Sequence, residues 1–236
     1  MFELEERLWW FRGMRAITAS LLDAPGTRRI QQVLDAGCGT GYSMIWLRER
    51  FTAHVCGVDS SLHAAAFWPK RGLDTAALAS VDKLPFSLGE FDLVTCFDVI
   101  YQLNDERASA AISEIHRVLA PGGLLFIREP AFQWMRGAHD KAVGTRRRYT
   151  RKDLRRLLLA HGFKVKRSTY ANTVLFCVAA PYRLLTRLMR SRQSDVKPVP
   201  DWINKILGAV LELEARALRR ITFPFGMSIV ALAVKK

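Results

Sequence analysis

Apolar runs of strand length alternate with helix-length segments along most of the chain. Val33 and Leu34 open the series, and the later runs are also rich in valine, isoleucine, leucine and phenylalanine. We expect strands at residues 33–35, 53–58, 75–79, 91–97, 124–129, 163–170 and 225–236. Helical patterns lie between them, at residues 2–22, 42–50, 61–71, 105–119 and 151–161. Alternation at this spacing predicts a parallel doubly wound α/β sheet.

Acidic residues follow four of these predicted strands. Asp35, Asp59, Asp98 and Glu129 each stand where an apolar run ends. The carboxyl ends of parallel strands meet at one edge of the sheet, which is where such folds bind their ligands. We therefore expect these carboxylates to gather around a site.

The first strand leads into a glycine-rich turn, within the sequence QVLDAGCGTGYS. Gly37, Gly39 and Gly41 have no Cβ, so the backbone can take positive φ angles and approach a ligand closely. The helix expected from Tyr42 then directs free N–H groups and its positive dipole end toward that ligand. Asp59 follows Gly41 by 18 residues, close to the spacing at which a carboxylate reaches a ribose hydroxyl. The pattern predicts a nucleotide-cofactor site, although a tight turn in another α/β protein begins the same way.

Composition narrows the class of protein. Half of the 236 residues are hydrophobic, and 36 Lys+Arg against 22 Asp+Glu give a net charge of +14, which favours anionic partners. The four cysteines show no metal-ligand spacing, so we expect buried free thiols, a reducing cytosol and no metal. The N-terminus is acidic and aromatic, unlike a signal peptide. The most apolar run, Thr173 to Tyr182, is too short to cross a membrane.

Five sequence motifs in order resemble the class I S-adenosylmethionine-dependent methyltransferases, in the group related to the ubiquinone/menaquinone C-methyltransferases. They read VLDAGCGTG, GVDSS, DKLPF, CFDVIYQL and VLAPGGLLFI. The resemblance covers residues 8–170 and the last strand. It implies a Rossmann-like sheet of seven strands, mostly parallel with the last strand antiparallel. In this family the final two strands usually form a hairpin, whereas here about fifty residues with two amphipathic helical patterns separate them, so we expect a helical insertion before the last strand.

The same resemblance implies where S-adenosylmethionine is held. The three glycines would border its methionine part, and Asp35 would face the ammonium group. The ribose would lie at Asp59 and Ser60, the adenine at Asp82, Lys83 and Leu84, and the sulfonium beside Phe97 and Asp98. The WWFRG segment resembles an N-terminal helix that closes over the cofactor, which assigns Trp10 and Arg12 to this lid.

Acceptor residues are expected in the mouth of the same site. A general base must reach the transferred proton directly or through one water. His139, Tyr149 and Asp98 are the candidates for that role. Tyr101, Glu129, Arg146 and Arg147 are expected to bind the acceptor, the arginines through a carboxylate, phosphate or diphosphate. The alternative for the arginines and for His139 is a solvated loop.

We expect a single domain over residues 1–236, with residues 1–24 as the helical lid and residues 172–222 as an insertion near the acceptor site. The insertion has two apolar stripes flanked by arginines. It can be a packed helical hairpin, a wall of the acceptor pocket, or a helix that contacts an anionic membrane.

The expected function is methyl transfer to a small, partly apolar acceptor, with anionic and lipid-like acceptors both open. Net charge alone suggests a nucleic-acid methyltransferase instead. Against that alternative, the fourth strand ends in CFDV and not in the [DN]PP[YF] of enzymes that methylate exocyclic amines. A protein that binds S-adenosylmethionine without transferring its methyl group is the third alternative.

Overall fold

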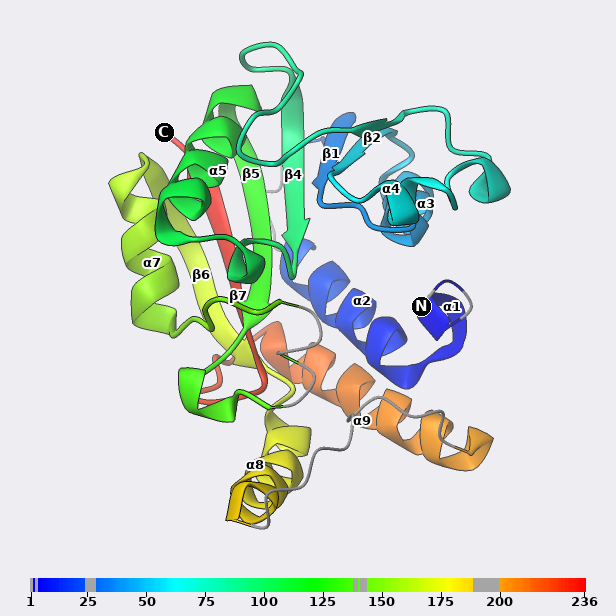
Figure 1. Cartoon of the computed structure of the whole chain (residues 1–236), viewed down its shortest axis with the longest axis vertical. Coiled ribbons are helices and arrows are strands. Elements are labelled where there is room, and N and C mark those ends of the chain that lie inside the picture. The colour runs from blue at the N-terminus through cyan, green and yellow to red at the C-terminus, as the bar shows by residue number, and fades with distance from the viewer. Residues whose placement is uncertain (1, 3, 24–28, 138–139, 141–143, 189–199) are drawn as a thin grey trace.

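A twisted sheet of seven strands forms the centre of the computed structural model, which describes residues 2, 4–23, 29–137, 140, 144–188 and 200–236 (Figure 1). The strand order is β3-β2-β1-β4-β5-β7-β6. The strands are β1 (Gln32–Ala36), β2 (His54–Asp59), β3 (Ala76–Leu78), β4 (Phe91–Phe97), β5 (Leu119–Pro130), β6 (Phe163–Ala171) and β7 (Ser228–Lys235).

Strand direction confirms the expected fold class. β1 to β5 pair in parallel, whereas β7 runs antiparallel to both β5 and β6. Val33 and Leu34 of β1 are fully buried, as expected of a strand that is covered on both faces. The carboxyl ends of β1, β2, β4, β5 and β6 therefore lie at one edge, next to the beginning of β7.

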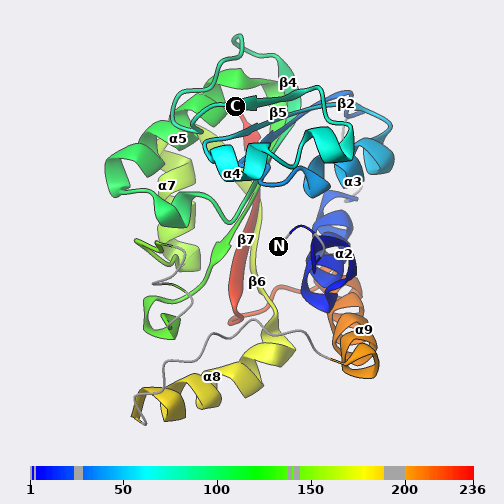
Figure 2. The same ribbon diagram turned by 45° about the vertical axis from the view of Figure 1, so that its right-hand side comes forward.

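Helices cover both faces of the sheet (Figures 1 and 2). One core layer joins Leu125 and Ile127 to helices α5 and α7, and the other joins Phe126 to helices α2, α3 and α9. The α-helices are α1 (Leu4–Arg7), α2 (Trp9–Leu22), α3 (Tyr42–Phe51), α4 (Leu62–Ala65), α5 (Asp105–Val118), α7 (Arg151–Ala160), α8 (Thr173–Leu188) and α9 (Asp201–Leu218). Short 3-10 helices are η1 (Pro69–Arg71), η2 (Ile100–Gln102) and η3 (Gln133–Met135).

The helical insertion before the last strand consists of α8 and α9. Helix α9 packs along α2, where Gly13 leaves room for Leu211, and Arg12 pairs with Glu212. Leu211 and Leu218 are fully buried, so this helix belongs to the core layer on that face. Within the described residues, no helix is long and apolar enough to span a membrane.

The cysteines only partly match the expectation of buried thiols. All four are free, and Cys38 and Cys96 are buried. Cys56 is half-buried and Cys177 is exposed, because its position on α8 faces solvent.

Candidate cofactor and acceptor site

The glycine turn after β1 is held against β2 and leaves one glycine open. The N–H groups of Gly37 and Cys38 both donate to the Val58 carbonyl, at 2.8 and 2.9 Å. Gly37, Gly39 and Gly41 all have positive φ angles, 89°, 54° and 89°. A Cβ on Gly37 or Gly41 would overlap a neighbouring side chain, but the Cβ position of Gly39 has no atom within 4 Å. Gly39 therefore presents its backbone to open space.

Asp59 lies directly beside this opening. One carboxylate oxygen accepts the Gly39 N–H and the other accepts the Ser61 N–H, both at 2.8 Å. The side chain is half-buried, and the neighbouring Ser60 is exposed. The turn thus brings a fixed carboxylate and an open backbone together, which suits a ligand with hydroxyl groups.

Two residues that sequence reasoning missed complete the turn. The buried Trp68 donates its indole N–H to the Gly39 carbonyl at 2.8 Å. The Thr40 hydroxyl donates to the Glu5 carboxylate, which joins the N-terminal segment to the turn. No spacing rule connects Trp68 or Glu5 to the glycines, because both come from distant parts of the chain.

The N-terminal segment is fixed in place by Arg71. This guanidinium pairs with Glu5 and Glu6, at 3.4 and 3.0 Å. It also lies over the rings of Phe2 and Tyr42, at 4.2 and 4.9 Å from their centroids. The start of the chain therefore lies against the glycine turn, the place where a lid was expected.

Asp35 is fully buried beneath the turn. Its carboxylate accepts hydrogen bonds from the hydroxyls of Ser43 and Thr95. Burial raises its pKa to about 6, more than those hydrogen bonds lower it. Asp35 of β1 is thus bonded to side chains of α3 and β4 and supports the turn from below.

We expect Asp35→Asn to change the pH dependence of stability. An acid whose pKa rises on folding stabilises the protein below the unfolded pKa, near 4, and that contribution is lost as the pH rises through about 6. The shift corresponds to a loss on the order of 3 kcal/mol. In urea unfolding from pH 4 to pH 8, the free energy of unfolding of the variant should rise relative to that of wild type by this amount. A constant difference across this range would contradict the assignment.

A matched pair of glycine variants separates binding from packing. Gly39→Ala should cost about 1 kcal/mol of stability because of its positive φ. Its methyl group also fills the open space, so cofactor affinity should fall at least about tenfold. Gly37→Ala overlaps Val99 and should instead lower the free energy of unfolding by about 2–3 kcal/mol. Equal cofactor affinity of Gly39→Ala and wild type, by calorimetry, would show that the open space is not a ligand site.

A partly buried ion pair lies at the carboxyl ends of β4 and β5. Arg128 donates to Asp98 from Nε and Nη2, at 2.9 and 2.5 Å. Its guanidinium lies between the rings of Trp10 and Phe97, at 5.0 and 4.9 Å from their centroids, and the residue is only 8% exposed. Asp98 has a left-handed φ of 56°. A shielded cation therefore stands beside the strand-end acid, and sequence reasoning did not identify it.

The two expected lid residues diverge in the structure. Trp10 reaches the strand ends through its contact with Arg128. Arg12 points to the other side, where it pairs with Glu212 of α9 at 2.8 Å. Residues two positions apart on a helix lie about 200° apart around its axis, so only one of the two can face the sheet edge.

The residues expected around the adenine lie on the flank of α5. Asp82 accepts from Arg107 at 2.6 Å and from the Ser80 hydroxyl, and the hydrogen bond from Arg107 lowers its pKa to about 2. Lys83 is exposed. Leu84 is buried in the core, and its N–H donates to Glu114. Asp82, Lys83 and Leu84 thus lie together, and the Asp82 carboxylate is already hydrogen-bonded to Arg107.

Glu129 and Tyr101, which we expected to bind the acceptor, are both buried and hydrogen-bonded to other groups of the protein. Glu129 is fully buried, and its oxygens accept the N–H groups of Val99, Ile100 and Tyr101, at 3.0 to 3.2 Å. It fixes the first residues of η2, which is a structural role. The Tyr101 hydroxyl accepts from Gln102, and burial raises the pKa of Tyr101 to about 12.

The arginine run lines a separate groove of about 430 Å³ at the beginning of α7. Arg147 pairs with Asp105 and Asp153, at 2.9 and 3.6 Å, and lies over the ring of Tyr149. Arg146 is exposed. Tyr149 is buried, which raises its pKa well above the ordinary value. His139 lies outside the described residues.

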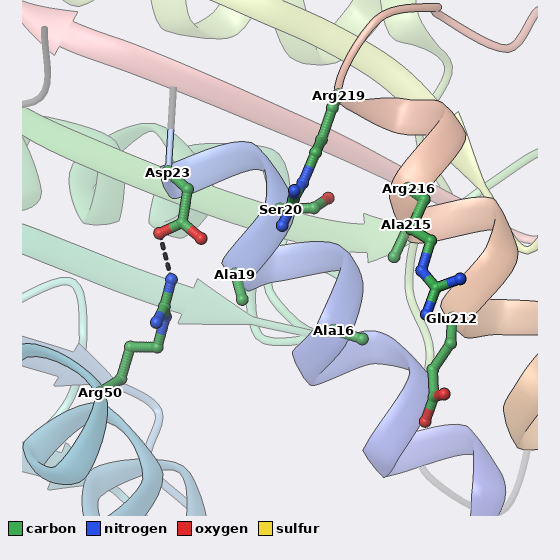
Figure 3. Close-up of a pocket in the computed structure, with 9 residues that line it drawn as sticks. All are labelled: Ala16, Ala19, Ser20, Asp23, Arg50, Glu212, Ala215, Arg216 and Arg219. Carbon is green, nitrogen blue, oxygen red and sulfur yellow. Dashed lines mark hydrogen bonds and ion pairs between the residues drawn. The ribbon is translucent and has the colours of Figure 1, made fainter. Parts of the chain in front are cut away.

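A second groove, of about 390 Å³, lies between the carboxyl-terminal halves of α2 and α9 (Figure 3). Its lining includes the ion pair of Arg50 with Asp23, together with Arg216 and Arg219. Asp23 caps the carboxyl end of α2, whereas Trp10 lies at the amino end of the same helix. This groove is therefore distant from the carboxyl ends of the strands. In the described part of the chain, no cluster of three or more His, Cys, Asp or Glu side chains could hold a metal ion.

The sequence matches known proteins over the region that forms this site. Residues 8–168 match a family described as a methyltransferase domain. Demethylmenaquinone methyltransferase of Beutenbergia cavernae is 36% identical over 126 residues, which cover 52% of this chain and 48% of that protein. The chain spans no more than about half the length of the curated relatives that it matches.

Solved structures share the fold over nearly the whole chain. An S-adenosylmethionine-dependent methyltransferase from Mesorhizobium loti has a TM-score of 0.60 at 19% identity, with 95% of this chain and 98% of that chain covered. Geranyl diphosphate methyltransferase in complex with SAM has a TM-score of 0.59 at 18% identity, with 94% and 84% covered. At these identities the likeness shows the fold alone.

Proposed function

Because the chain belongs to the class I S-adenosylmethionine-dependent methyltransferases, we propose that it methylates a small molecule that combines an apolar body with an anionic group. The observation that carries this proposal is Arg128, a nearly buried cation at the carboxyl ends of the central strands. Cytoplasmic small-molecule biosynthesis is the setting that we propose for the reaction.

The residues at the glycine turn fit the cofactor. Gly39 has open space where a Cβ would stand, and Asp59 holds a carboxylate at the edge of that space. Asp59 would accept the ribose hydroxyls, and the glycine turn would border the methionine part. When bound, S-adenosylmethionine supplies a methyl group that is already activated for displacement. The protein then has to orient the acceptor and exclude water.

Arg128 can orient an anionic acceptor. Asp98 occupies Nε and Nη2, and among the described residues no hydrogen-bond partner is found for Nη1. The rings of Trp10 and Phe97 shield the guanidinium, which strengthens its attraction to an anion relative to a solvated site. A planar guanidinium also suits a carboxylate or phosphate better than an ammonium does. Arg146 and Arg147, in the groove at the beginning of α7, would add to the preference for an anionic acceptor.

Aromatic side chains beyond the ends of β5 and β6 suit the apolar body. Phe132 packs against Trp134, Tyr170 and Phe176, with ring centroids 4.8 to 6.0 Å apart. Trp134 is 41% exposed, so part of this cluster is accessible. The names of two similar proteins fit such an acceptor, since one acts on demethylmenaquinone and the other on geranyl diphosphate.

A proton acceptor is needed only if the acceptor carries a proton on its nucleophilic atom. Asp98 lies at the strand ends but is paired with Arg128, and Tyr149 is buried. His139 remains the general base that we propose from the sequence.

Fractionated extracts test the acceptor class. Metabolite extracts separated into acidic and neutral fractions should be incubated with methyl-labelled S-adenosylmethionine and the protein. We expect label in a solvent-extractable product from the acidic fraction, and much less with Arg128→Leu. Label that precipitates with RNA, or that appears equally in neutral compounds, would contradict the proposal.

A further inference from the structure

Helix α9 carries a stripe of large apolar side chains on its solvent face. Trp202, Ile206 and Leu213 are 65%, 54% and 61% exposed. They are four and seven residues apart, so they follow one face of the helix. The opposite face already contributes Leu211 and Leu218 to the core. Single exposed apolar residues are ordinary, but a stripe with this period needs a covering partner.

Helix α8 has a similar stripe. Val174 and Val178 are 52% and 72% exposed, and Cys177 and Pro181, on the same face, are also exposed. This helix begins two residues after β6 ends, at the carboxyl edge of the sheet. In both views α8 and the beginning of α9 extend from the same end of the molecule (Figures 1 and 2).

The sequence segment that carries these stripes is rich in basic residues. Residues 173–220 contain nine Lys+Arg and four Asp+Glu. Two of the acids are engaged, because Glu214 is buried against the first N–H groups of α8 and Glu212 pairs with Arg12. Lys205, Arg216 and Arg220 are exposed on or just after α9. An anionic partner therefore suits this surface.

We propose that the exposed faces of α8 and α9 dock onto the surface of an anionic lipid bilayer. An amphipathic helix with tryptophan and leucine on one side and basic residues beside them lies in the membrane interface. Tryptophan favours that depth, and long basic side chains reach the head groups from it. A second copy of this chain is a poorer partner, because two molecules with a net charge of +14 repel each other. The inference does not depend on the acceptor, since lipid binding can be measured without turnover.

Vesicle flotation at physiological salt tests the proposal. We expect the full chain to float with phosphatidylcholine vesicles that contain phosphatidylglycerol, and not with phosphatidylcholine alone. Trp202→Ser with Ile206→Ser should weaken the partitioning about tenfold or more. Lys205→Gln with Arg220→Gln should weaken it about 25-fold, roughly fivefold for each charge. All four positions are exposed, so the variants should fold as wild type does, which circular dichroism checks.

Leu88→Ser with Leu159→Ser is the matched control. These leucines are 75% and 46% exposed, but they lie just before β4 and near the end of α7, toward the amino ends of the strands. Their variant should bind vesicles as wild type does. The proposal is overturned if wild type does not float with the anionic vesicles, if the control variant loses as much binding as the α9 variant, or if light scattering shows a dimer that Trp202→Ser dissociates.

Discussion

Replacing Asp59 by alanine should weaken cofactor binding by roughly 2–3 kcal/mol, or about 30- to 150-fold. The substitution removes the acceptor that we propose for the ribose hydroxyls. It also frees the Gly39 N–H, which Asp59 now accepts at 2.8 Å. The glycine turn would then lose the group that fixes its open residue. Calorimetric titration with S-adenosylhomocysteine measures the loss.

Asp74→Ala serves as the control, because Asp74 is an exposed acid in the same loop region. The affinity of Asp74→Ala for S-adenosylhomocysteine should equal that of wild type. The melting temperatures of both variants should lie within a few degrees of the wild-type value. If Asp59→Ala binds within twofold of wild type, the ribose does not lie at Asp59.

Arg128→Leu should lower the free energy of unfolding by about 3 kcal/mol. Removing one partner of a buried ion pair leaves the other charge uncompensated, at a cost of about 3–5 kcal/mol. The lower value applies because the Asp98 side chain is 24% exposed. Urea unfolding at neutral pH measures the change.

A double-mutant cycle with Asp98→Asn isolates the pair. In the Asp98→Asn background, Arg128→Leu should lower the free energy of unfolding by about 2 kcal/mol less than it does in wild type, because no charge is then left without a partner. Costs that simply add would show that Arg128 contributes through its packing between Trp10 and Phe97, and not through the ion pair.

Most of the fold could be predicted from the sequence, because strand burial and turn chemistry are local. Val33, Leu34 and the three glycines indicate a buried strand and a turn without reference to the rest of the chain. The antiparallel last strand came from the family resemblance, whereas the helical insertion came from the two amphipathic patterns in residues 172–222, which the common fold does not explain. The weakest predicted strand, at residues 75–79, is also the shortest, at Ala76–Leu78.

The candidate site was harder to predict because neighbours in a strand face opposite ways. Arg128 and Glu129 are adjacent, and the strand-end rule selected the acid. Arg128 lies on the side of Phe126, toward α2, whereas Glu129 lies on the side of α5 and is enclosed there. Which side opens to the site depends on the helices that cover each face, and these come from distant sequence.

Pairings between distant side chains were invisible for the same reason. Asp82, the acid in DKLPF, follows β3, but its bond to Arg107 depends on how α5 packs. The contact of Arg12 with Glu212 depends on a helix that begins about 190 residues later. Spacing rules identify groups that a ligand could use and do not show which of them the protein itself occupies.

Transfer of a trideuteromethyl group tests the central claim most directly. Wild-type protein should be incubated with metabolite extract and S-adenosylmethionine labelled with deuterium on its methyl group, and the small molecules analysed by mass spectrometry. We expect one acidic, solvent-extractable compound to gain the labelled methyl group, and much less of it with Asp59→Ala when S-adenosylmethionine is kept below the concentration that saturates this variant. Stoichiometric binding of S-adenosylmethionine without any labelled product would contradict the account and identify a cofactor-binding protein that does not transfer the methyl group.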